Sequence, residues 1–298
     1  MHTPQQGIFQ ENSSKFYHLE YKLNFSHPLA RLLKAISTVI SEGRDNVHLV
    51  IAFGPKAWRS LQPNWVPEEL EDFKTIDGIN GFTLPSTQRD VFFWVHSKNH
   101  DDNLDTVLKI QQIMGEVASL ELDLTGFAYH DSRDLTGFID GSANPKGDDR
   151  HQVAIIPDNL IGAGGSYVLT QQWKHQLREF SSLPLDQQEK VIGRTKSDSI
   201  ELAKNKMPEN SHVSRTDVEI DGKAMKIYRR SSPYGSATEQ GLYFLSFSCE
   251  INRFNIQLER MFGTTSDGIH DKLIEFSQPT TSSYWFAPSS EDLLELVS

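Results

Sequence analysis

Segments with the hydrophobic pattern of strands and segments with the hydrophobic pattern of helices follow one another in the first half of the chain. Runs rich in β-branched and aromatic residues predict strands at 16–25, 47–53, 91–97 and 119–130. Apolar residues at helical spacing predict helices within 27–43 and 101–117. The order strand, helix, strand, strand, helix, strand is typical of a ferredoxin-like unit, in which an antiparallel four-stranded sheet carries both helices on one face.

The second half repeats this order more loosely. Strands are predicted at 165–175, 224–231, 241–249 and 282–288, and helices at 185–194 and 252–263. Asp186 and Glu189 are placed like a capping box in the first of these helices, and Gly263 is placed to end the second. We therefore expect an α+β protein of two ferredoxin-like domains, residues 1–147 and 148–298, arranged like a dimeric α+β barrel.

Composition narrows the classes of function. The 298 residues carry a net charge of −11, which disfavours nucleic acid as a partner. No apolar stretch approaches the length needed to span a membrane, and the N-terminal residues do not have the pattern of a signal peptide. The single cysteine, Cys249, excludes an internal disulfide, and as a neighbour of apolar strand residues it is expected to be a small buried side chain. These features favour a soluble, cytoplasmic protein.

Three polar stretches could carry chemistry, although each also has an ordinary structural explanation. Asp140 lies in "GFIDGSANP", where an Asp-Gly pair is also a common turn. His212 lies in "NSHVSRTD", and a lone loop histidine is usually solvated. Arg229 and Arg230 are adjacent on a predicted strand, so they should point to opposite faces. The sequence contains no HExxH, CxxC or CxxCH motif, which excludes the common zinc signatures and covalent c-type haem.

Taken together, these three stretches resemble, in order and spacing, the dye-decolourising (DyP-type) haem peroxidases, and most closely their bacterial cytoplasmic branch. Gly137, Asp140 and Gly141 satisfy the GxxDG motif of that family. The likeness continues through "GLYFLSF", "ERMFG" and "YWFAPS" in the second half. The family's fold is two ferredoxin-like domains, which agrees with the strand order read from the hydrophobic pattern.

The resemblance implies a role for each matching residue. His212 would bind the iron of a non-covalent haem b. Asp140 and Arg229 would lie on the opposite face of the haem, with Ser231 on the same strand face as Arg229. The apolar strand that contains Phe247 would form one wall of the pocket.

Two details of this assignment stay open. Asp267 and Asp271 are among several possible acceptors for the N–H of the second ring nitrogen of His212. Ser142 and Ala143 stand where relatives often have Thr-Glu, so no role of that glutamate can be transferred to this chain.

The implied activity is reduction of hydrogen peroxide through a ferryl intermediate, followed by oxidation of an aromatic or dye-like donor. Asp140 would carry a proton, and Arg229, which stays protonated, would stabilise developing negative charge. Tyr129, Tyr234 and Trp285 are candidates for relaying electrons, but packing in the core or at the pocket rim is the favoured explanation for them.

Family members commonly assemble, so a homodimer or larger homo-oligomer is expected. The alternative function is a protein that binds or handles haem without significant peroxidase turnover. A ferredoxin-like RNA-binding module is disfavoured by the acidic charge and by the lack of an aromatic RNP-type motif.

Overall fold

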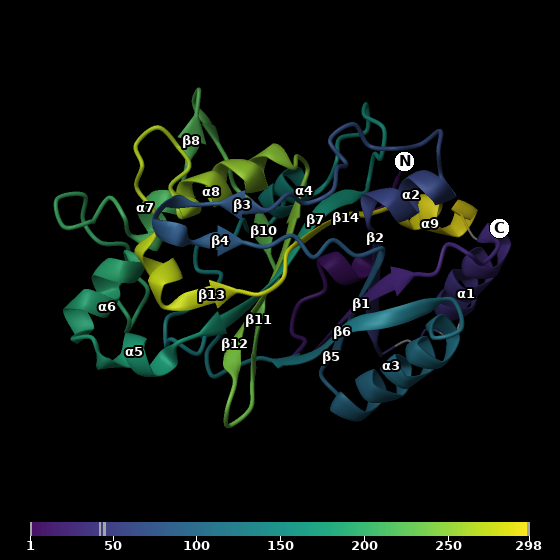
Figure 1. The fold of residues 1–298 in the computed structure, drawn as a ribbon, viewed down its shortest axis with the longest axis horizontal. Helices are drawn as coiled ribbons and strands as arrows, with labels where there is room; N and C mark the ends of the chain where they lie inside the picture. The colour runs from purple at the N-terminus through teal and green to yellow at the C-terminus, as the bar shows by residue number, and fades with distance from the viewer. Residues whose placement is uncertain (1, 42, 44–45, 297–298) are drawn as a thin grey trace.

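A large antiparallel sheet organises the computed structural model, which describes residues 2–41, 43 and 46–296 (Figure 1). The first half contributes β1 (Lys15–Leu23), β2 (His48–Phe53), β5 (Val91–Ser97) and β6 (Ala118–Phe127). The second half contributes β7 (Ser166–His175), β10 (Tyr228–Arg229), β11 (Ser232–Gly235), β12 (Gln240–Ser248), β13 (Ser277–Pro279) and β14 (Ser283–Ala287). The sheet order is β10-β12-β7-β14-β2-β5-β1-β6, with β11 on β12 and β13 on β7. The chain is therefore an α+β protein with one large antiparallel sheet.

The two halves use the same strand order. In each half, the first strand lies between the third and the fourth: β1 pairs with β5 and β6, and β7 pairs with β12 and β14. The pair Phe286–Phe53 connects β14 to β2, so the two predicted sheets form one continuous sheet. At its other end, β6 approaches β11 so closely that a Cβ on Gly126 would lie 2.2 Å from Ser232 Oγ. The sheet therefore curls until its two outer edges meet.

Nine α-helices cover or flank this sheet in the described part of the chain. They are α1 (Leu29–Ser41), α2 (Pro55–Leu61), α3 (His100–Met114), α4 (Asp149–Ala154), α5 (Leu177–Ser182), α6 (Leu185–Ile192), α7 (His212–Thr216), α8 (Asn252–Phe262) and α9 (Ser290–Leu296). The remaining short elements are β3 (Ile76–Asp77), β4 (Thr83–Leu84), β8 (Glu219–Ile220), β9 (Lys223–Ala224), and the 3-10 turns η1 (Gln6–Ile8), η2 (Ile79–Gly81) and η3 (Lys272–Glu275). None of the described helices is both long and apolar enough to cross a membrane.

Alternation along the strands divides the hydrophobic core into two. In β5, Phe93 belongs to a core that also contains buried residues of α1, α3 and α8. Its neighbours Phe92 and Trp94 belong to a second core, inside the curled sheet, together with Phe247 and Trp285. Because both faces are covered, these strands read as nearly continuous apolar runs.

Two local predictions are corrected by the structure. Pro184 precedes α6 and no side chain caps it; Asp186 instead accepts a hydrogen bond from Lys190 Nζ (3.1 Å), and Glu189 Oε1 accepts one from Lys196 N (3.0 Å). The strand predicted at 224–231 is interrupted, because side chains of α8 bind its backbone. The carbonyls of residues 225 and 226 accept from Gln257 Nε2 and Arg253 Nη1, so they are not used in a strand ladder.

Candidate active site

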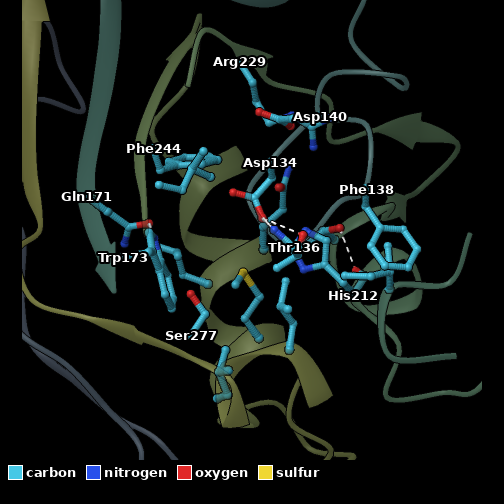
Figure 2. Close-up of a pocket in the computed structure, with 18 of the residues that line it drawn as sticks. Asp134, Thr136, Phe138, Asp140, Gln171, Trp173, His212, Arg229, Phe244 and Ser277 are labelled. Atoms are coloured by element: carbon cyan, nitrogen blue, oxygen red, sulfur yellow. Dashed lines mark hydrogen bonds and ion pairs between the residues drawn. The ribbon is translucent and has the colours of Figure 1, made fainter. Parts of the chain in front are cut away.

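A cavity lies on the helix-covered face of the second-half sheet, between that sheet and α7 and α8 (Figure 2). About 1030 Å³ among its walls is not filled by protein atoms, and part of that space opens to solvent. Most of the wall is apolar and comes from Leu169, Trp173, Ile192, Ile227, Leu242, Phe244, Phe254, Leu258, Met261, Leu273 and Ile274. The polar side chains at its border include Asp140, His212 and Arg229, so the structure brings the three predicted site residues to one cavity.

The register of β12 determines which aromatic residue faces this cavity. Leu242 and Phe244 line it, whereas Phe247 has the opposite phase and packs inside the curled sheet against Trp94 and Tyr228. The structure therefore corrects the expectation that Phe247 forms the pocket wall. The apolar strand was identified correctly, but its other face lines the cavity.

His212 is held by a buried carboxylate. It is the first residue of α7, whose N-cap Ser211 accepts a hydrogen bond from Ser214 N. His212 Nδ1 donates to Asp271 Oδ2 over 2.6 Å, and the Asp271 side chain is fully buried. Because Nδ1 carries the donated proton, Nε2 keeps its lone pair for a ligand. This geometry identifies Asp271 as the acceptor among the several candidates.

Asp267 has a different partner. Its two carboxylate oxygens accept from Arg215, at 2.8 Å and 3.1 Å. Hydrogen bonds from Arg215 and Thr265 hold the pKa of Asp267 well below its usual range. Arg215 is almost completely buried in α7, so this pair anchors the helix rather than the histidine ring.

Asp140 and Arg229 lie together at one side of the cavity, while His212 projects from another side (Figure 2). Arg229 Nε is 3.9 Å from Asp140 Oδ1, too long for a hydrogen bond. That Nε atom is buried and has no hydrogen-bond partner among the described residues. A buried, unpaired donor beside an apolar cavity is the expected condition of a group whose partner is a bound ligand.

The backbone of Arg229 is fixed by Asn144, four residues after Asp140. Asn144 Oδ1 accepts from Arg229 N (2.9 Å) and Asn144 Nδ2 donates to Arg229 O (2.7 Å). The polar loop therefore supplies both the acid and the clamp on the arginine. Asn144 was not among the site residues predicted from the sequence.

The residues after Arg229 alternate as predicted, but Ser231 does not reach the cavity. The guanidinium of Arg230 points away, donates to the carbonyls of Ile8 (2.8 Å) and Gln10 (2.7 Å), and lies over the ring of Trp94. Ser231 lies between β10 and β11; its Oγ is buried without a partner among the described residues, and it is not one of the cavity-lining side chains.

A second polar cluster in the cavity was not predicted from the sequence. His175, the last residue of β7, places Nε2 3.0 Å from Asp134 Oδ1 and Nδ1 2.7 Å from Ser277 Oγ. Burial alone would raise the pKa of Asp134, but the charge of His175 and hydrogen bonds from His175 and Thr136 outweigh it, and the pKa is lowered. The only available signal was that His175 shares a strand face with Trp173.

The candidate electron relays and the cysteine lie outside the described cavity wall. Tyr129 is half-buried, Tyr234 is 4% exposed and Trp285 is fully buried in the inner core. Tyr234 donates to the carbonyl of the cavity-lining Trp173 at 3.3 Å. Cys249 is buried, and burial raises its thiol pKa, as expected for a small packed side chain.

The donor set fits haem better than a metal ion held by protein ligands alone. No group of three or more His, Cys, Asp or Glu side chains in the described residues could hold a metal ion. An iron at His212 would therefore have to bring most of its ligands with it, as a porphyrin does. The apolar walls and the unpaired Arg229 Nε suit such a flat, largely apolar group with polar chemistry at its centre.

Comparison with known proteins identifies the family. The family model "Dyp-type peroxidase, N-terminal" matches residues 5–128, and "Dyp-type peroxidase, C-terminal" matches residues 131–292. The chain is 33% identical over 269 residues to the dye-decolorizing peroxidase of Mycobacterium tuberculosis, covering 89% of this chain and 79% of that protein.

Solved structures agree over nearly the whole length. A putative dyp-type peroxidase protein from Shewanella oneidensis superposes with a TM-score of 0.93 at 33% identity, covering 99% of both chains. A variant of DypB from Rhodococcus jostii RHA1 in complex with heme gives a TM-score of 0.89 at 28% identity, covering 98% of both chains. The fold is thus that of the solved DyP-type structures. The chain belongs to the DyP-type peroxidase family.

Proposed function

We propose that this chain binds non-covalent haem b through His212, reduces hydrogen peroxide, and oxidises aromatic or dye-like donors. The observation that carries this proposal is the arrangement within one apolar cavity: a histidine fixed by a buried carboxylate, and an acid–arginine pair separate from it. The heme complex of a DypB variant supports the choice of cofactor. The common strand order of the two halves supports two ferredoxin-like domains, 1–147 and 148–298.

The bound haem would supply the iron that binds peroxide and would accept its two oxidising equivalents. Asp140 Oδ1 accepts the N–H of Gly141 at 2.7 Å, which leaves Oδ2 to take a proton from peroxide and return it to the departing oxygen. Arg229 cannot act as the base because it stays protonated; its positive charge stabilises the negative charge that develops in the transition state.

On the other side, the carboxylate of Asp271 orients the imidazole of His212 and increases the electron density at Nε2. The apolar walls exclude water, which strengthens these electrostatic interactions. The donor substrate and the expected homo-oligomer remain predictions.

The test uses purified protein titrated with haemin, followed by rapid mixing with hydrogen peroxide. We expect a Soret band on loading and a fast absorbance change on mixing. Asp140→Asn and Arg229→Leu should retain haem but slow that change by about 100-fold or more. His212→Ala should lose or loosen the haem. Arg230→Leu is the matched control, because this neighbouring arginine points away from the cavity.

Two results would contradict the proposal. Normal peroxide reactivity in both the Asp140 and Arg229 variants would remove their proposed roles. Haem-loaded wild-type protein that does not react with peroxide, but readily passes its haem to apomyoglobin, would be a haem carrier and not a peroxidase.

A further inference from the structure

Asp140 is carried by a tight hairpin. Asp140 N donates to Ser132 O (2.9 Å), and Asp134 N donates to Phe138 O (2.8 Å), so residues 132–134 run antiparallel to 138–140. Gly137 closes the tip with a φ of +89°, a conformation that favours glycine. Because the two arms are hydrogen-bonded to each other, a shift at Asp134 near the tip is transmitted to Asp140.

The tip of this hairpin is tied to the large sheet through side chains. Asp134 Oδ1 is 3.0 Å from His175 Nε2, and His175 Nδ1 is 2.7 Å from Ser277 Oγ. His175 and Ser277 are register partners in β7 and β13, so the anchor stands on paired strands. The Asp134 and His175 side chains are only 13% and 6% exposed. The connection is therefore a mostly buried hydrogen bond rather than a flexible surface contact.

The carboxylate of Asp140 depends on this support. Its hydrogen bond to the N–H of Gly141 comes from its own loop, and the 3.9 Å gap to Arg229 Nε is too long for a hydrogen bond. Arg229 is fixed to the end of the same loop through Asn144. The hairpin itself has two further attachments: Arg133 donates to the carbonyls of residues 196 and 197, and the Asp134–His175 pair is the attachment that reaches the sheet.

We infer that Asp134 and His175 are positioning residues: their buried hydrogen bond, supported by Ser277, holds the hairpin so that Asp140 meets peroxide beside Arg229. This inference rests on the proposed peroxidase function. Asp134 acts through Asp140, since the proton is carried at Asp140 Oδ2. A displacement of about 1 Å in a catalytic group can cost about 100-fold in rate, so loss of the anchor should be measurable.

The experiment compares haem-reconstituted wild type, Asp134→Asn, Asp140→Asn and the double variant by rapid mixing with peroxide. Asp134→Asn should slow the reaction by about 10- to 100-fold while haem affinity changes little. The double variant should be no slower than Asp140→Asn alone, because there is then no carboxylate left to position. Asp131→Asn removes an exposed ion pair with Arg133 of the same hairpin. It should leave the rate unchanged, because exposed pairs contribute little and Arg133 keeps its hydrogen bonds to the carbonyls of residues 137, 196 and 197.

A second readout does not use turnover. Amide hydrogen exchange of the haem-free protein should increase across 132–140 in Asp134→Asn and not in Asp131→Asn. If Asp134→Asn does not fold, Ser277→Ala removes only the hydroxyl contact to His175 and should give a smaller effect in the same direction, which Ser277→Thr restores.

The outcomes separate the two proposals. If wild type does not react with peroxide, the proposed function fails. Amide hydrogen exchange across 132–140 then remains as the test of the Asp134–His175 contact. If wild type reacts but Asp134→Asn is equally fast, or if the Asp134 and Asp140 effects multiply, the positioning role is wrong.

Discussion

The strongest test of the contact between His212 and Asp271 is to remove His212 and measure the stability of the haem-free protein. Asp271 is fully buried, and it receives hydrogen bonds from His212 Nδ1 at 2.6 Å and from Leu273 N at 2.8 Å. In His212→Ala, the carboxylate keeps only the backbone donor. We therefore expect a loss of stability even before haem is added, because a buried carboxylate has lost one of its two hydrogen-bond donors.

The size of this loss follows from the geometry. A hydrogen bond to a charged group contributes about 1.5–3 kcal/mol. The His212 side chain is 28% exposed, so water partly screens the pair and the lower part of that range applies. A loss of about 1.5–2 kcal/mol corresponds to a fall in melting temperature of about 2–3 °C for a chain of 298 residues.

Urea and thermal unfolding of haem-free protein measure this directly. Asp271→Asn in the His212→Ala background removes the stranded charge and should recover most of the stability, yet it cannot restore haem binding. Asp271→Asn alone should weaken haem binding by about 10- to 100-fold. Asp267→Asn should not, because Asp267 contacts Arg215 and not the histidine. If the double variant is no more stable than His212→Ala, the buried-charge explanation is refuted.

Two further predictions concern the inner core and the cavity wall. Burial raises the pKa of the Glu20 carboxyl. The contribution of Glu20 to folding stability is therefore complete below the usual pKa of 4.5 and is lost as pH rises toward the folded-state pKa, by up to about 1.4 kcal/mol per pH unit. In urea titrations, Glu20→Gln should therefore become more stable relative to wild type as pH rises above 4.5. A difference in stability that does not change with pH would contradict the raised pKa. The buried His18 is present in both proteins, so its titration cancels in the comparison. Phe244→Ala should weaken haem binding in a haemin titration. Phe247→Ala, on the opposite strand face, should lower the free energy of unfolding by about 3–5 kcal/mol but leave haem affinity nearly unchanged. If the Phe244 and Phe247 variants lose haem affinity equally, both strand faces contact the cofactor and the assignment is wrong.

The sequence predicted the long strands and helices well because their apolar periods are strong and regular. It could not decide the phase of β12. Both of its faces are apolar, one toward the cavity through Leu242 and Phe244 and the other toward the inner core through Leu245 and Phe247. An alternating pattern identifies two faces but does not say which cavity each one meets.

The candidate site likewise has a part that the sequence could predict and a part that it could not. Asp140, His212 and Arg229 were found because their stretches carry recognisable local motifs, and the structure brings them to one cavity. Their supports are hydrogen bonds between residues far apart in the chain, such as His212 to Asp271 and Asp134 to His175.

Such a pairing depends on where two loops meet after folding, so Asp267 and Asp271 were equally good candidates in the sequence. The same argument explains why the Asp134–His175 pair could not be foreseen. Each residue has an ordinary local role, in a turn and at a strand end. Only their burial against each other converts them into a connection between the sheet and the hairpin that carries Asp140.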